Sequence, residues 1–93
     1  MQKTVVYDGS RFIPATLEIS LGETVRFVNQ GSNLMWVASN PHPMHTGLSS
    51  FDERNGVPNG GSYEYTFAEE GTFGYHNHLN PSAKGQVTVI LEK

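Results

Sequence analysis

The chain has 93 residues, a formal net charge of −3 and no cysteine. This length predicts one small domain, residues 1–93, with a modest core. Lys and Arg total only six, so no basic stripe exists and neither nucleic acid nor an anionic membrane is an expected partner. No apolar run reaches the length of a membrane span. Without cysteine there are no disulfides, thiolate metal ligands or thiol catalysis.

Short runs rich in Val, Thr, Ile, Phe and Tyr are separated by ten glycines and five prolines, which is typical of an all-β sandwich or barrel. We predict about seven strands, at Thr4–Tyr7, Thr16–Ser20, Thr24–Asn29, Leu34–Ser39, Ser62–Phe67, Thr72–His78 and Gly85–Leu91. Period-two alternation assigns their inner faces. The predicted core is Leu17, Ile19, Leu21, Val25, Phe27, Tyr63, Tyr65, Phe67, Phe73, Tyr75, Val87, Val89 and Leu91, with a contribution from Trp36.

The longest irregular stretch runs from residue 40 to residue 59. So long a loop in so small a domain is usually functional. A short helix is expected around Ser49–Arg54. The carboxylates of Asp52 and Glu53 are expected in a solvated loop or in the first turn of that helix.

All four histidines occur in two tight pairs, His42 with His45 and His76 with His78. Imidazole is the commonest protein ligand for zinc, copper and nickel. Two short-spaced pairs from distant segments are what a fold needs to assemble a four-nitrogen metal site. The alternative is that two polar loop ends happen to be rich in histidine.

The order of these segments resembles the cupredoxins, the copper-binding Greek-key sandwiches that include plastocyanin and amicyanin. Residues 17–29 resemble the family's strand, Gly turn and strand ending in Asn. Residues 60–67 and 71–76 resemble the hairpin that leads into the metal loop, and residues 81–89 resemble the return strand. The resemblance covers most of the chain and implies a Greek-key β-sandwich or barrel.

The family's copper ligands do not carry over. Matching the last loop puts Asn77 at the position of the Cys ligand, Asn80 at the second His and Ala83 at the Met. The first His position falls near Met35. A blue type 1 centre is therefore excluded, because its properties depend on a Cys thiolate.

The four histidines remain as the candidate ligands. His76 and His78 are two residues apart on a predicted strand, so both rings leave one face. Tyr75 and Asn77 have the opposite parity and face the family pocket. The loop of His42 and His45 would then fold over the outer face, giving a more exposed centre. Four neutral imidazoles suit one tetragonal Cu(II) per chain, with Zn(II) as the less favoured alternative, and neither Met35 nor Met44 is a favoured ligand for Cu(I).

The leading hypothesis is a copper-binding cupredoxin-like protein with a non-blue, type 2-like site, acting in copper handling or slow redox chemistry rather than fast electron transfer. Two alternatives stay open. One is a copper enzyme acting on superoxide, peroxide or oxygen, and the other is a metal-free interaction module. We expect a periplasmic or extracellular monomer whose signal peptide is absent from this sequence, with a redox or copper-delivery protein as a candidate partner.

Overall fold

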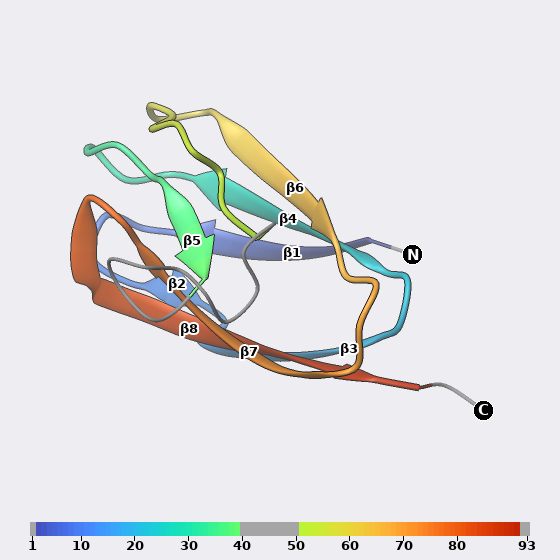
Figure 1. Cartoon of the computed structure of the whole chain (residues 1–93). Helices are drawn as coiled ribbons and strands as arrows, with labels where there is room; N and C mark the ends of the chain where they lie inside the picture. Colours follow the sequence, from blue (N-terminus) through green and yellow to red (C-terminus); the bar gives the residue numbers. More distant parts are fainter. Residues whose placement is uncertain (1, 40–50, 92–93) are drawn as a thin grey trace.

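The computed structural model describes residues 2–39 and 51–91, which form eight strands. The strands are β1 (Gln2–Tyr7), β2 (Phe12–Ile13), β3 (Thr16–Ser20), β4 (Thr24–Asn29), β5 (Val37–Ser39), β6 (Ser62–Thr66), β7 (Gly71–Asn77) and β8 (Asn80–Ile90). They build two four-stranded sheets, ordered β2-β1-β4-β6 and β3-β8-β7-β5. Figure 1 shows the sheets as two stacked layers. The expected all-β Greek-key sandwich is confirmed.

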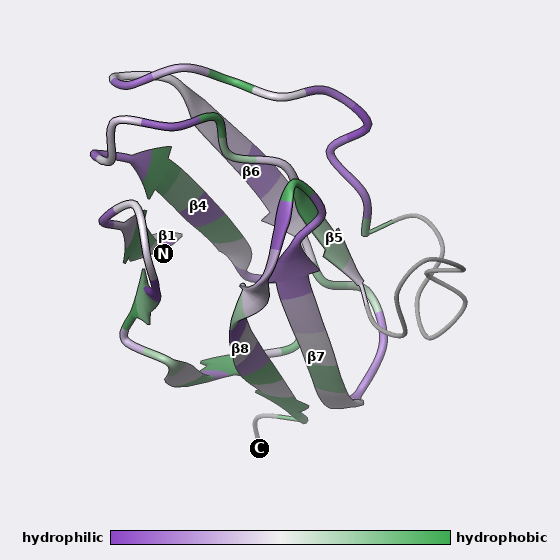
Figure 2. Cartoon of the chain, turned by 90° about the vertical axis from the view of Figure 1, so that its left-hand side faces the viewer, coloured by the Kyte–Doolittle hydropathy of each residue, from purple (hydrophilic) through white to green (hydrophobic). Residues whose placement is uncertain are grey.

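Each sheet contains one parallel pair, β1 with β4 and β3 with β8, and its other pairs are antiparallel. The register places apolar residues of neighbouring strands opposite one another, as in the pairs Ile19 with Val89 and Phe27 with Tyr63. Since side chains alternate along a strand, this register gives each sheet one apolar face. Figure 2 shows the resulting bands of hydrophobic and hydrophilic residues along β4.

The core between the two sheets is built largely from aromatic rings. Phe27 lies within 5.2 Å of Tyr75 and 5.7 Å of Phe51, measured between ring centroids. Buried aromatic pairs add to the free energy gained from their apolar area alone. Among the described residues, the buried apolar ones are Val5, Tyr7, Phe12, Ile19, Val25, Phe27, Met35, Val37, Ala38, Phe51, Phe67, Tyr75, Ala83, Val87 and Val89.

Two core assignments made from the alternation are wrong. Leu21 is 39% exposed and Leu91 is 61% exposed. Each continues the alternation of its strand, but Leu21 belongs to the turn after β3 and Leu91 follows the end of β8. Neither position is therefore covered by the opposite sheet.

The helix expected around Ser49–Arg54 is not formed by residues 51–54. Asp52 forms an isolated antiparallel bridge with Ala38, and Val57 forms one with Met35. The main-chain N–H of Glu53 donates to the Val37 carbonyl at 2.7 Å. This segment therefore continues the sheet beyond β5, and the expectation of a helix is wrong for residues 51–54. Within the described ranges, no helix is long and apolar enough to cross a membrane.

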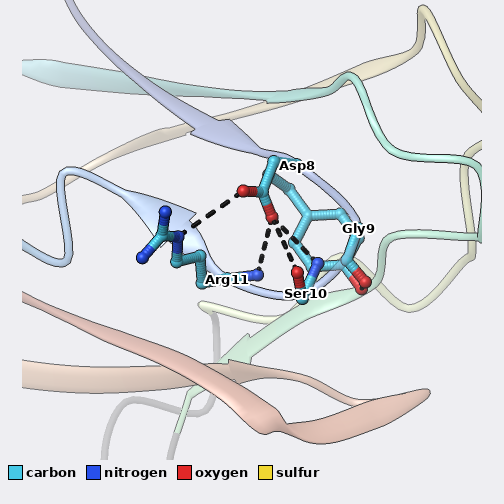
Figure 3. A network of polar contacts seen from close by, with 5 residues as sticks. Asp8, Gly9, Ser10 and Arg11 are labelled. Atoms are coloured by element: carbon cyan, nitrogen blue, oxygen red, sulfur yellow. Dashed lines mark hydrogen bonds and ion pairs between the residues drawn. The ribbon is translucent and has the colours of Figure 1, made fainter.

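The turn after β1 is fixed by one carboxylate. Asp8 Oδ1 accepts the main-chain N–H groups of Ser10 and Arg11, both at 2.9 Å (Figure 3). The carboxylate also pairs with the Arg11 side chain at 3.5 Å. Hydrogen bonds from Asp to the next backbone groups are a standard way to stabilise a tight turn. The turn places the Gly9 carbonyl where the Tyr7 hydroxyl donates to it at 3.0 Å.

Candidate metal centre

His76 lies near the end of β7, opposite Ala38 of β5. Its neighbour Tyr75 packs into the core, so the alternation of the strand turns His76 toward the outer face of the sheet. His78 follows two residues later. The two imidazole rings lie 6.4 Å apart between centroids. These two histidines are therefore neighbours at the end of β7.

The burial of the pair differs from the expectation of an exposed centre. His76 is only 1% exposed, whereas His78 is half-buried. A buried neutral imidazole avoids the desolvation penalty of the charged form. Ligation requires that same neutral form. Burial of His76 is therefore compatible with a ligand role.

Trp36 and Asp52 complete the side-chain cluster on this outer face. The Trp36 indole lies 4.6 Å from the His78 ring, at an interplanar angle of 42°. Its Nε1–H donates to Asp52 Oδ1 at 2.8 Å. Neither residue was a predicted member of the site, since Trp36 was expected in the core and Asp52 in a solvated loop or the first turn of a helix. Because Trp36 and Asp52 alternate with the inward-facing Val37 and Phe51, period-two alternation indicates that both face outward.

The position of the family's thiolate is occupied by an amide that makes three hydrogen bonds to the main chain. Asn77 is buried, and its Oδ1 accepts the main-chain N–H groups of Trp36 at 3.0 Å and Leu79 at 3.1 Å. Its Nδ2 donates to the Leu34 carbonyl at 3.0 Å. This side chain therefore cross-links two segments of backbone, and its oxygen is already engaged by two donors.

The other three family positions also lack a metal-binding arrangement. Met35 and Ala83 are buried in the apolar core. Asn80 Nδ2 donates to the Tyr7 hydroxyl at 3.4 Å, and its Oδ1 accepts from Ser82 at 3.0 Å. Between its pairs with Lys84 and Asn80, β7 shifts register against β8, which sets residues 81–83 outside the regular ladder. This donor set does not fit copper.

Glu53 also differs from its expected position in a solvated loop or the first turn of a helix. It lies on the inner side of its segment, where Oε1 accepts the Val37 N–H at 2.9 Å. Its Oε2 is buried without a hydrogen-bond partner among the described residues. Burial raises the pKa of this carboxyl to about 7. The hydrogen bond from the Val37 N–H acts in the opposite direction and lowers the pKa, but by less. Burial also raises the pKa of the neighbouring Tyr63 hydroxyl well above its usual range.

The other expected pair, His42 and His45, lies outside the described residues. Within residues 2–39 and 51–91, no group of three or more His, Asp or Glu side chains could hold a metal ion. The described part of the chain therefore contributes two neighbouring imidazoles, a ligand type that suits copper. They do not form a complete coordination shell by themselves.

The two sheets and their strand order define a cupredoxin fold in a chain without cysteine, which confirms the resemblance seen in the sequence. A purple cupredoxin from Nitrosopumilus maritimus superposes with a TM-score of 0.82 at 25% identity, over 95% of this chain and 99% of its own. Two amicyanin variants in their Cu(I) forms superpose with TM-scores of 0.82 and 0.81, at 22% and 24% identity. Each match covers 95% of this chain and 81% of amicyanin, and at this identity it supports the fold alone. No family model and no curated protein sequence matches the chain.

Proposed function

We propose that this protein binds one copper ion per chain through His42, His45, His76 and His78, in a non-blue, type 2-like site. The observation that carries the proposal is that the His76 and His78 rings lie 6.4 Å apart, with His76 near the end of β7 and His78 immediately after the strand. Two neutral imidazoles so placed provide half of the nitrogen set that Cu(II) favours. The second pair comes from the segment between β5 and residue 51.

The filled family pocket supports moving the metal to the opposite face of β7. Asn77 faces away from the two histidines, and its amide oxygen already accepts two N–H groups. The two amicyanin variants that share this fold are Cu(I) forms, and this favours copper as the metal. Copper also binds nitrogen ligands more tightly than zinc in the usual affinity order.

The role that fits such a site is copper storage, delivery or slow redox chemistry. Rapid electron transfer is disfavoured, because an all-imidazole site lacks the thiolate and reorganises between Cu(II) and Cu(I). We place the protein in the periplasm or outside the cell, as a monomer of one domain that exchanges copper with a redox or delivery partner. An enzyme of superoxide, peroxide or oxygen chemistry would need an open coordination position.

Titration of metal-free protein with Cu(II), followed by EPR and by fluorescence, tests the proposal. Trp36 is the single tryptophan and lies 4.6 Å from the His78 ring, so bound Cu(II) should quench its emission. We expect one equivalent, nitrogen superhyperfine structure and no intense thiolate band. A lack of uptake would favour the metal-free interaction module, whereas preferential uptake of zinc would identify the alternative metal.

A further inference from the structure

The Trp36 side chain lies between an anchor on one side and a candidate ligand on the other. Its indole N–H donates to Asp52 Oδ1 at 2.8 Å. Its ring lies against the His78 imidazole at 4.6 Å. An indole can only donate one hydrogen bond, so this contact with Asp52 fixes which way the ring is turned.

The anchor is itself held by the sheet. Asp52 pairs with Ala38, and its Oδ1 also accepts the Arg54 main-chain N–H at 2.9 Å. On either side of it, Phe51 is buried in the core and Glu53 accepts the Val37 N–H. The segment that carries the Asp52 carboxylate is therefore held both by core packing of Phe51 and by hydrogen bonds to β5.

His78 is the candidate ligand that the Trp36 ring contacts directly. It follows the last paired residue of β7, and its main-chain N–H donates to the Trp36 carbonyl at 2.7 Å. The hydrogen bond of the His78 main chain does not by itself set the rotamer of the His78 side chain. A metal ligand must present one ring nitrogen in a defined direction, and neighbours of the ligand usually provide that orientation.

We propose that Trp36 is a positioning residue, anchored by Asp52, which holds the His78 imidazole in the orientation required for copper. The inference rests on the function proposed above. It adds a contact that regulates the affinity and geometry of the site from outside the set of ligands. Trp36 acts through His78 and is not itself a ligand.

NMR of the metal-free protein tests the positioning directly. The Trp36 ring should shift the resonances of the His78 ring protons by its ring current. Asp52→Ala removes the acceptor of the indole N–H, and should move the His78 shifts toward those of Trp36→Leu. Asp52→Asn keeps an oxygen acceptor and should restore the native shifts. Identical His78 shifts in wild-type protein and in Asp52→Ala would overturn the anchoring role.

Copper binding by the same variants tests the consequence. Trp36→Leu and Asp52→Ala should weaken copper affinity by about tenfold or more, the effect typical of residues that orient a ligand. Their EPR hyperfine splitting should change, and Asp52→Asn should restore both properties. Phe73→Leu is the matched control, because it removes a half-buried aromatic ring near the start of β7, where it packs on Phe67. It should lower stability without changing the EPR spectrum.

The outcomes separate this inference from the proposed function. Tight copper binding with the same affinity and spectrum in wild-type protein and Trp36→Leu overturns the positioning role and leaves the proposed function intact. Absence of copper binding in wild-type protein overturns the proposed function and the inference together. A loss in Phe73→Leu equal to that in Trp36→Leu would assign the effect to general destabilisation and also overturn the inference.

Discussion

The amide oxygen of Asn77 accepts the main-chain N–H of Trp36 at 3.0 Å, on the face of β7 opposite to His76. One short segment thus carries two kinds of side chain on its two faces. Asn77 ties β7 to the backbone around residues 34–36, whereas His76 and His78 belong to the candidate centre. The structural and metal-binding roles can therefore be separated by single substitutions.

Asn77→Ala should destabilise the protein and leave copper binding intact. The substitution removes the partners of the Trp36 and Leu79 N–H groups and of the Leu34 carbonyl, at a cost of about 3 kcal/mol in the free energy of unfolding. Chemical denaturation measures the loss. His76→Ala and His78→Ala are the comparison, and each should abolish tight copper binding. Loss of copper in Asn77→Ala, with retention in His78→Ala, would put the metal in the family pocket.

The close contact between Gly31 and Gly9, in the turn after β1, gives a prediction about the fold itself. A Cβ on Gly31 would lie 2.4 Å from the Gly9 Cα and 2.9 Å from the Asp8 carbonyl carbon. Both are backbone atoms, and Asp8 holds this turn through its hydrogen bonds with Ser10 and Arg11 (Figure 3). Gly31→Ala should therefore cost about 2 kcal/mol or more of stability, measured by thermal unfolding. Gln30→Ala, at an exposed neighbouring position, should change little.

Much of the fold was predictable because its strands have one buried face. β3 and β4 begin and end where the alternation placed them, at Thr16–Ser20 and Thr24–Asn29. The two-residue strand β2 is too short to show a period. The bridge between Ala38 and Asp52 joins residues far apart in sequence, and a local pattern carries no information on such pairing.

The candidate site was predictable only as far as the alternation reached. The common face of His76 and His78 follows from their spacing, and so does the inward direction of Asn77. The positions of Trp36, Asp52 and Glu53 depend instead on the strand-like course of residues 51–53. An amphipathic residue such as Trp can serve a core or a half-buried outer face, so its sequence position alone leaves the choice open.

Glu53 should make the metal-free protein less stable as the pH rises. Its folded-state pKa is raised to about 7 from an ordinary value of 4.5, so between these values the folded state binds the extra proton. The free energy of unfolding should therefore fall from pH 4.5 to pH 7 and level off above. Glu53→Gln should remove this decline and gain about 1 kcal/mol at pH 8, a value discounted for partial exposure. Glu18→Gln is the control, because Glu18 is an exposed residue of β3. An equal gain in stability there would contradict the assignment of the pH dependence to Glu53.

Copper should impose the opposite trend on the holo-protein. Protons compete with the metal for imidazole nitrogens, whose ordinary pKa is about 6.5. The increase in melting temperature caused by Cu(II) should accordingly be small at pH 5 and large at pH 8, while the metal-free protein loses stability over part of that range through Glu53. Paired thermal scans with and without one equivalent of Cu(II) measure the increment. It should disappear in His78→Ala and persist in Glu53→Gln, which separates ligand protonation from the buried carboxyl. A copper increment that stays constant between pH 5 and pH 8 would count against a site made of histidines.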